Sequence, residues 1–126
     1  MEKLILVAVG GAVGASARYV AGAQAMRLGS AWPYGTFAIN IVGGLLMGVL
    51  VGFLAHRGGG DQERLRVLLG VGVLGGFTTF SAFSLEVALM IEKRAYGQAF
   101  SYSLLSVVLS VAALFAGLML ARRVFA

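Results

Sequence analysis

Four apolar runs, each close to the length that spans a lipid bilayer, dominate this chain of 126 residues. They cover residues 4–26, 32–55, 65–91 and 100–120. A membrane-spanning α-helix needs about 20 such residues, and only a helix or a closed barrel satisfies the backbone inside lipid. The chain has 60% hydrophobic and 12% charged residues. If it folded as a water-soluble domain, it could not bury so many apolar side chains away from water. The sequence therefore predicts an all-α membrane protein, with residues 1–126 forming a single four-helix transmembrane domain.

The composition excludes several classes of function. The chain has no cysteine and one histidine, which rules out disulfide frameworks, thiolate metal sites and histidine-cluster metal sites. Its net charge of +5 comes from basic residues at the ends of apolar runs, a distribution typical of membrane proteins and not of nucleic-acid-binding proteins. No nucleophile and base can be paired from the polar residues, so the sequence does not indicate an enzyme.

Basic residues divide unevenly between the two sides of the expected bundle. The N-terminus, the middle connector and the C-terminus carry six of them: Lys3, Arg57, Arg64, Arg66, Arg122 and Arg123. The other two connectors carry three: Arg27, Lys93 and Arg94. This bias favours cytoplasmic termini only modestly, and it does not force one orientation in the membrane.

The start of the chain also has features of a cleavable signal peptide. Lys3 precedes an apolar run, and residues 15–17 read Ala-Ser-Ala. The apolar run nevertheless resumes after Arg18 and reaches residue 23, so we interpret it as an uncleaved first span.

Glycines recur at four-residue spacing in three of the runs. They are Gly10 and Gly14, then Gly44, Gly48 and Gly52, then Gly72 and Gly76. Small residues at this spacing allow two helix backbones to approach closely, either within one bundle or between chains. Four helices cannot easily enclose a pore and also bury so many small faces, so we expect an oligomer, most economically a two-fold dimer.

The third run contains a stretch, residues 70–86, that does not favour a continuous helix. It combines the pair Gly75 and Gly76 with two threonines and with phenylalanines that alternate with serines. Broken backbone inside a membrane is tolerated only where it is buried in protein or lines a cavity. Carbonyls freed by such a break also suit a hard cation such as Na⁺. The stretch therefore predicts a helix broken mid-membrane for ion binding.

Arg18, Asn40 and Glu86 carry strongly polar side chains within the spans. A charge at the centre of a membrane helix costs about 2.5–3.5 kcal/mol, so such residues face a partner or a water-filled cavity. Each also has a structural interpretation. Arg18 can snorkel from the end of its span, Asn40 can bond to a neighbouring helix, and Glu86 can pair with an arginine.

Hydroxyl groups form a stripe on the last span. Tyr102, Ser106 and Ser110 share one helix face, with Ser103 beside them, and the stripe is about 12 Å long. The serines can bond to carbonyls of their own helix. Alternatively, a row of hydroxyls can pass a small anion along by donating hydrogen bonds.

Phenylalanines recur every three residues beside the expected break. Aromatic residues at helical spacing usually pack in the core, and we keep that interpretation for Phe77. Phe80 and Phe83 differ because they alternate with Ser81 and Ser84. The positive edges of their rings can attract a small anion without the full charge that would trap it.

Three motifs stand in order along the chain. They read GGAVGASARY at residues 10–19, GTFAIN at 35–40 and GGFTTFSAFS at 75–84. Together with the length and the four spans, they resemble the small bacterial fluoride channels, the Fluc (CrcB) family. The resemblance implies a passive, fluoride-selective channel that exports cytoplasmic fluoride across the inner membrane and gives fluoride resistance. It also implies an antiparallel, dual-topology homodimer with two pores.

The resemblance further assigns roles to residues of this sequence. It implies a fluoride pathway formed by Phe80, Phe83, Asn40, Tyr102, Ser106, Ser110, Ser81 and Ser84, although Leu114 is apolar where the track could continue. Arg18, Glu86 and Thr36 become candidates for a vestibule or gate. The backbone carbonyls of Gly75 and Thr78 would hold a structural Na⁺ on the two-fold axis of the dimer.

Two other membrane functions remain as alternatives. A small proton-coupled multidrug exporter also has four short spans, but it needs a carboxylate in its first helix, and residues 4–26 contain none. A non-conducting subunit of a larger complex would not need the polar stripe or the broken helix.

Overall fold

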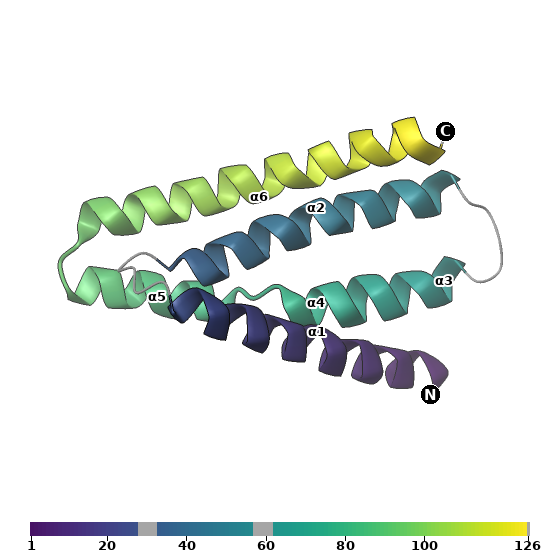
Figure 1. The fold of residues 1–126 in the computed structure, drawn as a ribbon, viewed down its shortest axis with the longest axis horizontal. Helices are drawn as coiled ribbons and strands as arrows, with labels where there is room; N and C mark the ends of the chain where they lie inside the picture. The colour runs from purple at the N-terminus through teal and green to yellow at the C-terminus, as the bar shows by residue number, and fades with distance from the viewer. Residues whose placement is uncertain (28–32, 57–61, 126) are drawn as a thin grey trace.

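The computed structural model is helical and describes residues 1–27, 33–56 and 62–125, in which there is no β-strand (Figure 1). Three long helices are α1 (Glu2–Met26), α2 (Tyr34–His56) and α6 (Tyr96–Phe125). The segment between α2 and α6 divides into α3 (Gln62–Leu65), the π-helix η1 (Arg66–Leu74), α4 (Gly75–Phe77) and α5 (Ser81–Glu92).

Among the described residues, four helical segments are long and apolar enough to cross a membrane, which confirms the predicted number of spans. Their boundaries differ from the apolar runs. The last helix begins at Tyr96 and ends at Phe125, beyond the predicted 100–120, because Gln98 and the terminal arginines are good helix formers outside the apolar part. The predicted start of the second span, residue 32, lies outside the described residues, as does Arg57.

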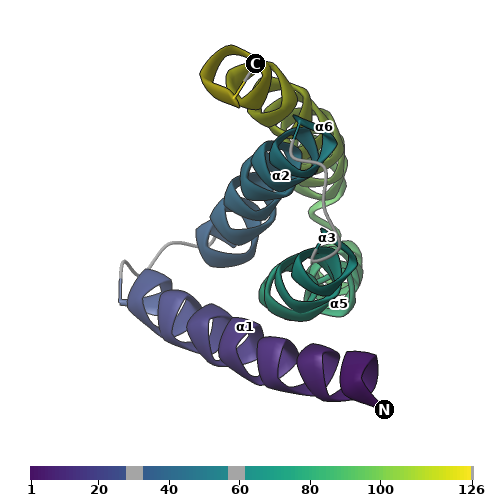
Figure 2. The ribbon, with the colours of Figure 1, turned by 90° about the vertical axis from the view of Figure 1, so that its right-hand side faces the viewer.

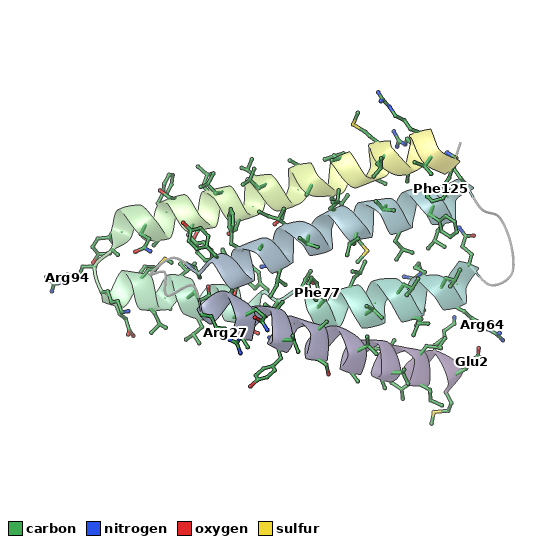
Figure 3. The ribbon with its side chains drawn as sticks, in the orientation of Figure 1. Glu2, Arg27, Arg64, Phe77, Arg94 and Phe125 are labelled. Carbon is green, nitrogen blue, oxygen red and sulfur yellow. The ribbon has the colours of Figure 1, made fainter. Side chains whose placement is uncertain are left out.

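The spans pack as two pairs: α2 with α6, and α1 with the third span. Figure 2 shows α2 against α6, with α1 lying beside the third span. Both termini lie at the same end of the bundle (Figure 1). Ion pairs join α1 to the start of the third span at that end. Arg64 Nε lies 2.6 Å from Glu2 Oε1 (Figure 3). Lys3 Nζ lies 3.7 Å from Glu63 Oε1.

The glycine rows bring helices together within the chain. A Cβ added to Gly44 would lie 2.7 Å from the carbonyl oxygen of Ser110 on α6, and one added to Gly10 would lie 3.0 Å from Gly72 Cα on η1. Gly48 likewise leaves no room beside the α6 backbone. Contacts inside one chain thus account for these glycines. The glycine spacing therefore does not by itself require the second chain that we expected from it.

The third span changes its backbone twice. Over Arg66–Leu74 it is a π-helix, a wide form that the sequence did not predict. After Phe77 it leaves the helical region, because Thr78 is extended, with φ −81° and ψ 157°. The chain becomes helical again at Ser81. This interruption lies within the stretch 70–86 that the sequence singled out.

Candidate functional site

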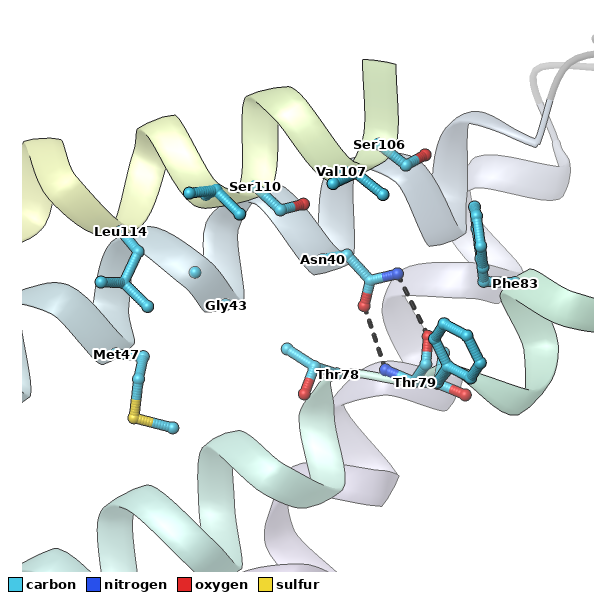
Figure 4. Close-up of a pocket in the computed structure, with 13 residues that line it drawn as sticks. Asn40, Gly43, Met47, Thr78, Thr79, Phe83, Ser106, Val107, Ser110 and Leu114 are labelled. Atoms are coloured by element: carbon cyan, nitrogen blue, oxygen red, sulfur yellow. Dashed lines mark hydrogen bonds between the residues drawn. The ribbon is translucent and has the colours of Figure 1, made fainter. Parts of the chain in front are cut away.

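The interruption between α4 and α5 is bonded to α2 through the side chain of Asn40. Its Oδ1 accepts the Thr79 N–H at 3.0 Å, and its Nδ2 donates to the Thr79 carbonyl at 3.1 Å (Figure 4). The amide thereby takes the place of a neighbouring peptide group and satisfies backbone that has left the helix. The interhelical hydrogen bond expected of Asn40 is observed, and its partner is the backbone of Thr79.

The Thr79 side chain also contacts the first turn of the helix that follows. Its Oγ1 accepts the N–H of Ala82 at 3.2 Å and lies 3.3 Å from Ser81 Oγ. A threonine hydroxyl in this position supplies one of the acceptors that the first turn of a helix lacks. Sequence reasoning did not single out Thr79, although a threonine three residues before Ala82 matches the pattern of a helix start.

Two carbonyls at the interruption have lost their usual helical donors. In a continuous helix the Gly75 carbonyl would accept the N–H of Thr79, and the Thr78 carbonyl would accept the N–H of Ala82. Those two N–H groups donate to Asn40 Oδ1 and to Thr79 Oγ1 instead. Among the described residues no cluster of His, Cys, Asp or Glu could hold a metal. Backbone carbonyl oxygens are of the ligand type that hard cations accept.

Arg18 contacts α4 just before the interruption. Its Nε donates to the Gly76 carbonyl at 3.4 Å, a long hydrogen bond from α1 to α4. The guanidinium therefore does more than snorkel toward the membrane surface.

A cavity of about 430 Å³ lies beside the interruption, between α2, α5 and α6 (Figure 4). It brings together five of the predicted pathway residues: Asn40, Phe80, Phe83, Ser106 and Ser110. Leu114 and Met47 line its other end, so the polar lining stops near Ser110. Ser81, Ser84 and Tyr102 are not part of this lining.

The serine hydroxyls in this cavity are buried without a partner. Neither Ser106 Oγ nor Ser110 Oγ meets hydrogen-bond geometry with any group in the part of the chain that the structure describes. The alternative that they bond to carbonyls of their own helix is therefore not observed. A buried hydroxyl left unpaired costs about 1–3 kcal/mol, so this cavity favours an occupant that accepts hydrogen bonds.

Aromatic rings continue from the cavity into the protein. The ring centroids of Phe80 and Phe83 are 5.6 Å apart, and those of Phe83 and Tyr102 are 5.2 Å apart. Tyr102 is completely buried, whereas Phe80 is 77% exposed on the single chain. Phe83 thus contacts both of the other rings.

A second cavity, of about 600 Å³, lies where α1, α2 and α5 meet. Its lining contains the three vestibule candidates, Arg18, Thr36 and Glu86. Glu86 Oε1 accepts the Thr36 hydroxyl at 2.5 Å, and Oε2 accepts the Tyr102 hydroxyl at 3.0 Å. The carboxylate is therefore bonded to α2 and α6, and the salt bridge to arginine suggested by the sequence is not what holds it. Thr79 lines both cavities.

Comparison with known proteins gives consistent matches along the chain. The family described as "CrcB-like protein, Camphor Resistance (CrcB)" matches residues 5–118. A protein of Phenylobacterium zucineum named "Fluoride-specific ion channel FluC" is 74% identical over 127 residues, covering 100% of both chains. Proteins with the same name from Caulobacter vibrioides and Mesorhizobium japonicum are 68% and 50% identical. They cover 100% and 97% of this chain, and 100% and 98% of their own lengths.

Proposed function

The chain belongs to the CrcB family, and we propose that it is a fluoride-specific ion channel that exports cytoplasmic fluoride passively and gives fluoride resistance. It is a multi-pass membrane protein and a channel, not an enzyme. For a channel of this kind in a bacterium, the proposed location is the cytoplasmic (inner) membrane.

The observation that carries this proposal is the cavity with two unpaired serine hydroxyls beside a pair of phenyl rings. Fluoride that leaves water must exchange its hydration shell for other donors. Ser106 and Ser110 offer O–H groups, and Phe80 and Phe83 offer the positive edges of their rings. Among the described residues no cationic side chain lines this cavity, so an anion can bind and still leave.

We propose that the two cavities form a route for the ion. We call the second cavity the vestibule. In it, Arg18 and Lys93 provide positive charge that attracts an anion, while the hydroxyl groups of Thr36 and Tyr102 bond to the Glu86 carboxylate. Thr79 lies between the vestibule and the cavity with the serines. We propose that fluoride passes this point beside Phe80 and Phe83 and continues to Ser106 and Ser110. The hydroxyls of Ser81 and Ser84, exposed at the start of α5, would assist from the side of Phe80.

The functional unit in this proposal is an antiparallel, dual-topology homodimer. The non-helical backbone from Thr78 to Phe80 cannot face lipid, which offers no hydrogen-bond partners. In one chain Asn40 of α2 bonds to this backbone, while the Phe80 ring and the nearby Gly75 remain exposed. A second copy is the most economical cover. Basic residues at both ends of the bundle are compatible with both orientations.

A structural Na⁺ would complete this dimer. The carbonyl oxygens of Gly75 and Thr78 would hold it, since the N–H groups that would normally bond to them are used elsewhere. When bound, the cation supplies positive charge that neutralises carbonyl dipoles contributed by both chains.

Fluoride efflux from proteoliposomes, followed with a fluoride electrode, tests the proposed function. We expect rapid fluoride efflux and no matching chloride efflux from vesicles that contain the protein. Absent fluoride efflux, or chloride efflux at a similar rate, would refute it. Uptake of a lipophilic cation driven by a proton gradient would instead indicate the multidrug exporter.

A further inference from the structure

We propose that Asn40 is a positioning residue that holds the interruption of the third span open through the Thr79 backbone. By doing so it keeps the Gly75 carbonyl available to a cation and fixes the place of Phe80. This goes beyond lining a vestibule, and it rests on the proposed function, which supplies the ion and the cation concerned.

The first support is the paired geometry of the Asn40 amide. Its oxygen accepts the Thr79 N–H and its nitrogen donates to the Thr79 carbonyl, at 3.0 and 3.1 Å. This pair of hydrogen bonds engages both the N–H and the carbonyl of Thr79, so it sets the orientation of the Thr79 backbone. Since the oxygen is bonded to the backbone, one side chain on α2 fixes how the chain runs between α4 and α5.

The second support is the competition for one N–H group. Without Asn40 Oδ1, the Thr79 N–H has its ordinary helical acceptor, the Gly75 carbonyl, one turn earlier. Forming that bond would extend α4 and would occupy an oxygen proposed for Na⁺. Asn40 therefore determines whether the Gly75 carbonyl points to a cation or to its own helix.

The third support is the way α2 docks on the third span. Thr36, Asn40 and Gly43 follow one face of α2, and they contact Glu86, Thr79 and Thr78 respectively. The methyl group of Thr78 occupies the space in which a side chain on Gly43 would lie. This close approach fixes the position of α2 along the third span. The Asn40 amide therefore hydrogen-bonds to Thr79 and to no other described residue of that span.

The consequence reaches the phenyl rings through Thr79. Phe80 follows Thr79 directly in the chain, and the Thr79 hydroxyl accepts the N–H of Ala82 in the first turn of α5. Since α5 also carries Phe83, a shift of Thr79 moves both rings that line the cavity.

Sodium dependence separates this positioning role from that of a simple ligand in the vestibule. The experiment compares Asn40→Leu, which has similar volume and no polar group, with Asn40→Asp, which keeps an acceptor for the Thr79 N–H. Thr36→Ala is the matched control, because it removes a polar group one turn earlier on α2 that bonds to Glu86 and not to the interruption. Thermal stability of the purified protein is measured as sodium replaces choline at constant ionic strength, together with fluoride efflux at low and high sodium.

We expect the sodium concentration for half-maximal stabilisation to rise by about tenfold or more in Asn40→Leu, the equivalent of losing one good ligand. In Asn40→Asp and Thr36→Ala it should be no higher than in the unchanged protein. Fluoride efflux through Asn40→Leu should fall by roughly tenfold at low sodium and recover in part at high sodium.

An unchanged sodium midpoint in Asn40→Leu, or an unchanged protein that does not respond to sodium, overturns the inference. So does an efflux defect that sodium does not relieve, which is the result expected of a direct ligand. If Asn40→Leu does not fold, Asn40→Ser, which is too short to reach Thr79, replaces it with the same expected outcomes. Fluoride efflux through the unchanged protein is measured in the same preparation, so failure of the proposed function is distinguishable.

Discussion

The two faces of α2 are held in place by different forces. One face carries Gly44 and Gly48, and it packs so closely on α6 that no side chain fits between the two backbones. The other face carries Thr36 and Asn40, which reach the third span through hydrogen bonds. The contact of the packed face with α6 depends on the small volume of its side chains. The contact of the polar face with the third span depends on which hydrogen-bonding atoms are present and where they point. The helix α2 thus connects the closely packed α6 to the interruption of the third span, which we propose contacts the ions.

Gly48→Leu, on the packed face, should have a larger effect than any change on the polar face. A side chain at Gly48 would collide with the backbone around Leu114 on α6, and backbone cannot move aside as a side chain can. Overpacking costs about 1–3 kcal/mol where side chains can adjust, so we expect a larger loss at this position and little or no folded protein. Size-exclusion chromatography and circular dichroism of the detergent-purified variant would measure it. A folded Gly48→Leu protein with normal stability would show that α2 and α6 do not pack as described.

Phe80→Ile tests the part of the third span that the polar face of α2 contacts beside the cavity. The substitution removes a ring edge and keeps an apolar side chain, so we expect fluoride efflux to fall by roughly tenfold with little change in folding. Phe115→Ile is the matched control, since Phe115 is an exposed ring on α6 that lines neither cavity beside the interruption. Efflux through the Phe80 variant equal to that of the control would remove this ring from the pathway.

The two faces also differ in how well the sequence predicted them. Apolar length predicts four spans, and glycine spacing predicts close helix pairs, because both follow from general properties of lipid and backbone. The same glycine spacing could not tell contacts within one chain from contacts between two chains. The pattern of glycines and threonines singled out the stretch in which Thr78 is extended, yet it did not predict the π-helix at Arg66–Leu74, which packs against α1.

Individual contacts of the site were not readable from the sequence. Asn40 stood out as a polar residue in a span, but its partner, the Thr79 backbone, lies 39 residues further along the chain. Glu86 similarly suggested an arginine partner, whereas folding brings it to two hydroxyl groups. Sequence patterns identify which residues need a partner in lipid, and only the packed helices determine which partner they meet.

Ser110→Ala should lower transport without lowering stability. Removing a buried hydroxyl that has no partner among the described residues should leave stability unchanged or raise it by about 1 kcal/mol. Fluoride efflux should fall by roughly tenfold, because a hydrogen bond to a charged ion contributes about 1.5–3 kcal/mol. Thermal unfolding and electrode-measured efflux of the same preparation would be compared with those of Ser101→Ala, an exposed serine on the same helix. A clear loss of stability in Ser110→Ala would mean that its hydroxyl serves the fold and not the ion.

Gly97→Ala should have the smallest effect, and it separates glycine as a residue type from glycine at a packed position. A Cβ added to Gly97, in the first turn of α6, meets nothing within 4 Å among the described residues, in contrast to one added to Gly48. Alanine lowers the conformational freedom of the unfolded chain, so we expect a gain of about 0.4–1 kcal/mol in unfolding free energy and unchanged fluoride efflux. Thermal unfolding of Gly97→Ala beside Gly48→Leu would measure the difference. A marked loss of stability in Gly97→Ala would mean that this end of α6 is covered in the assembled channel, which would place a second chain against it.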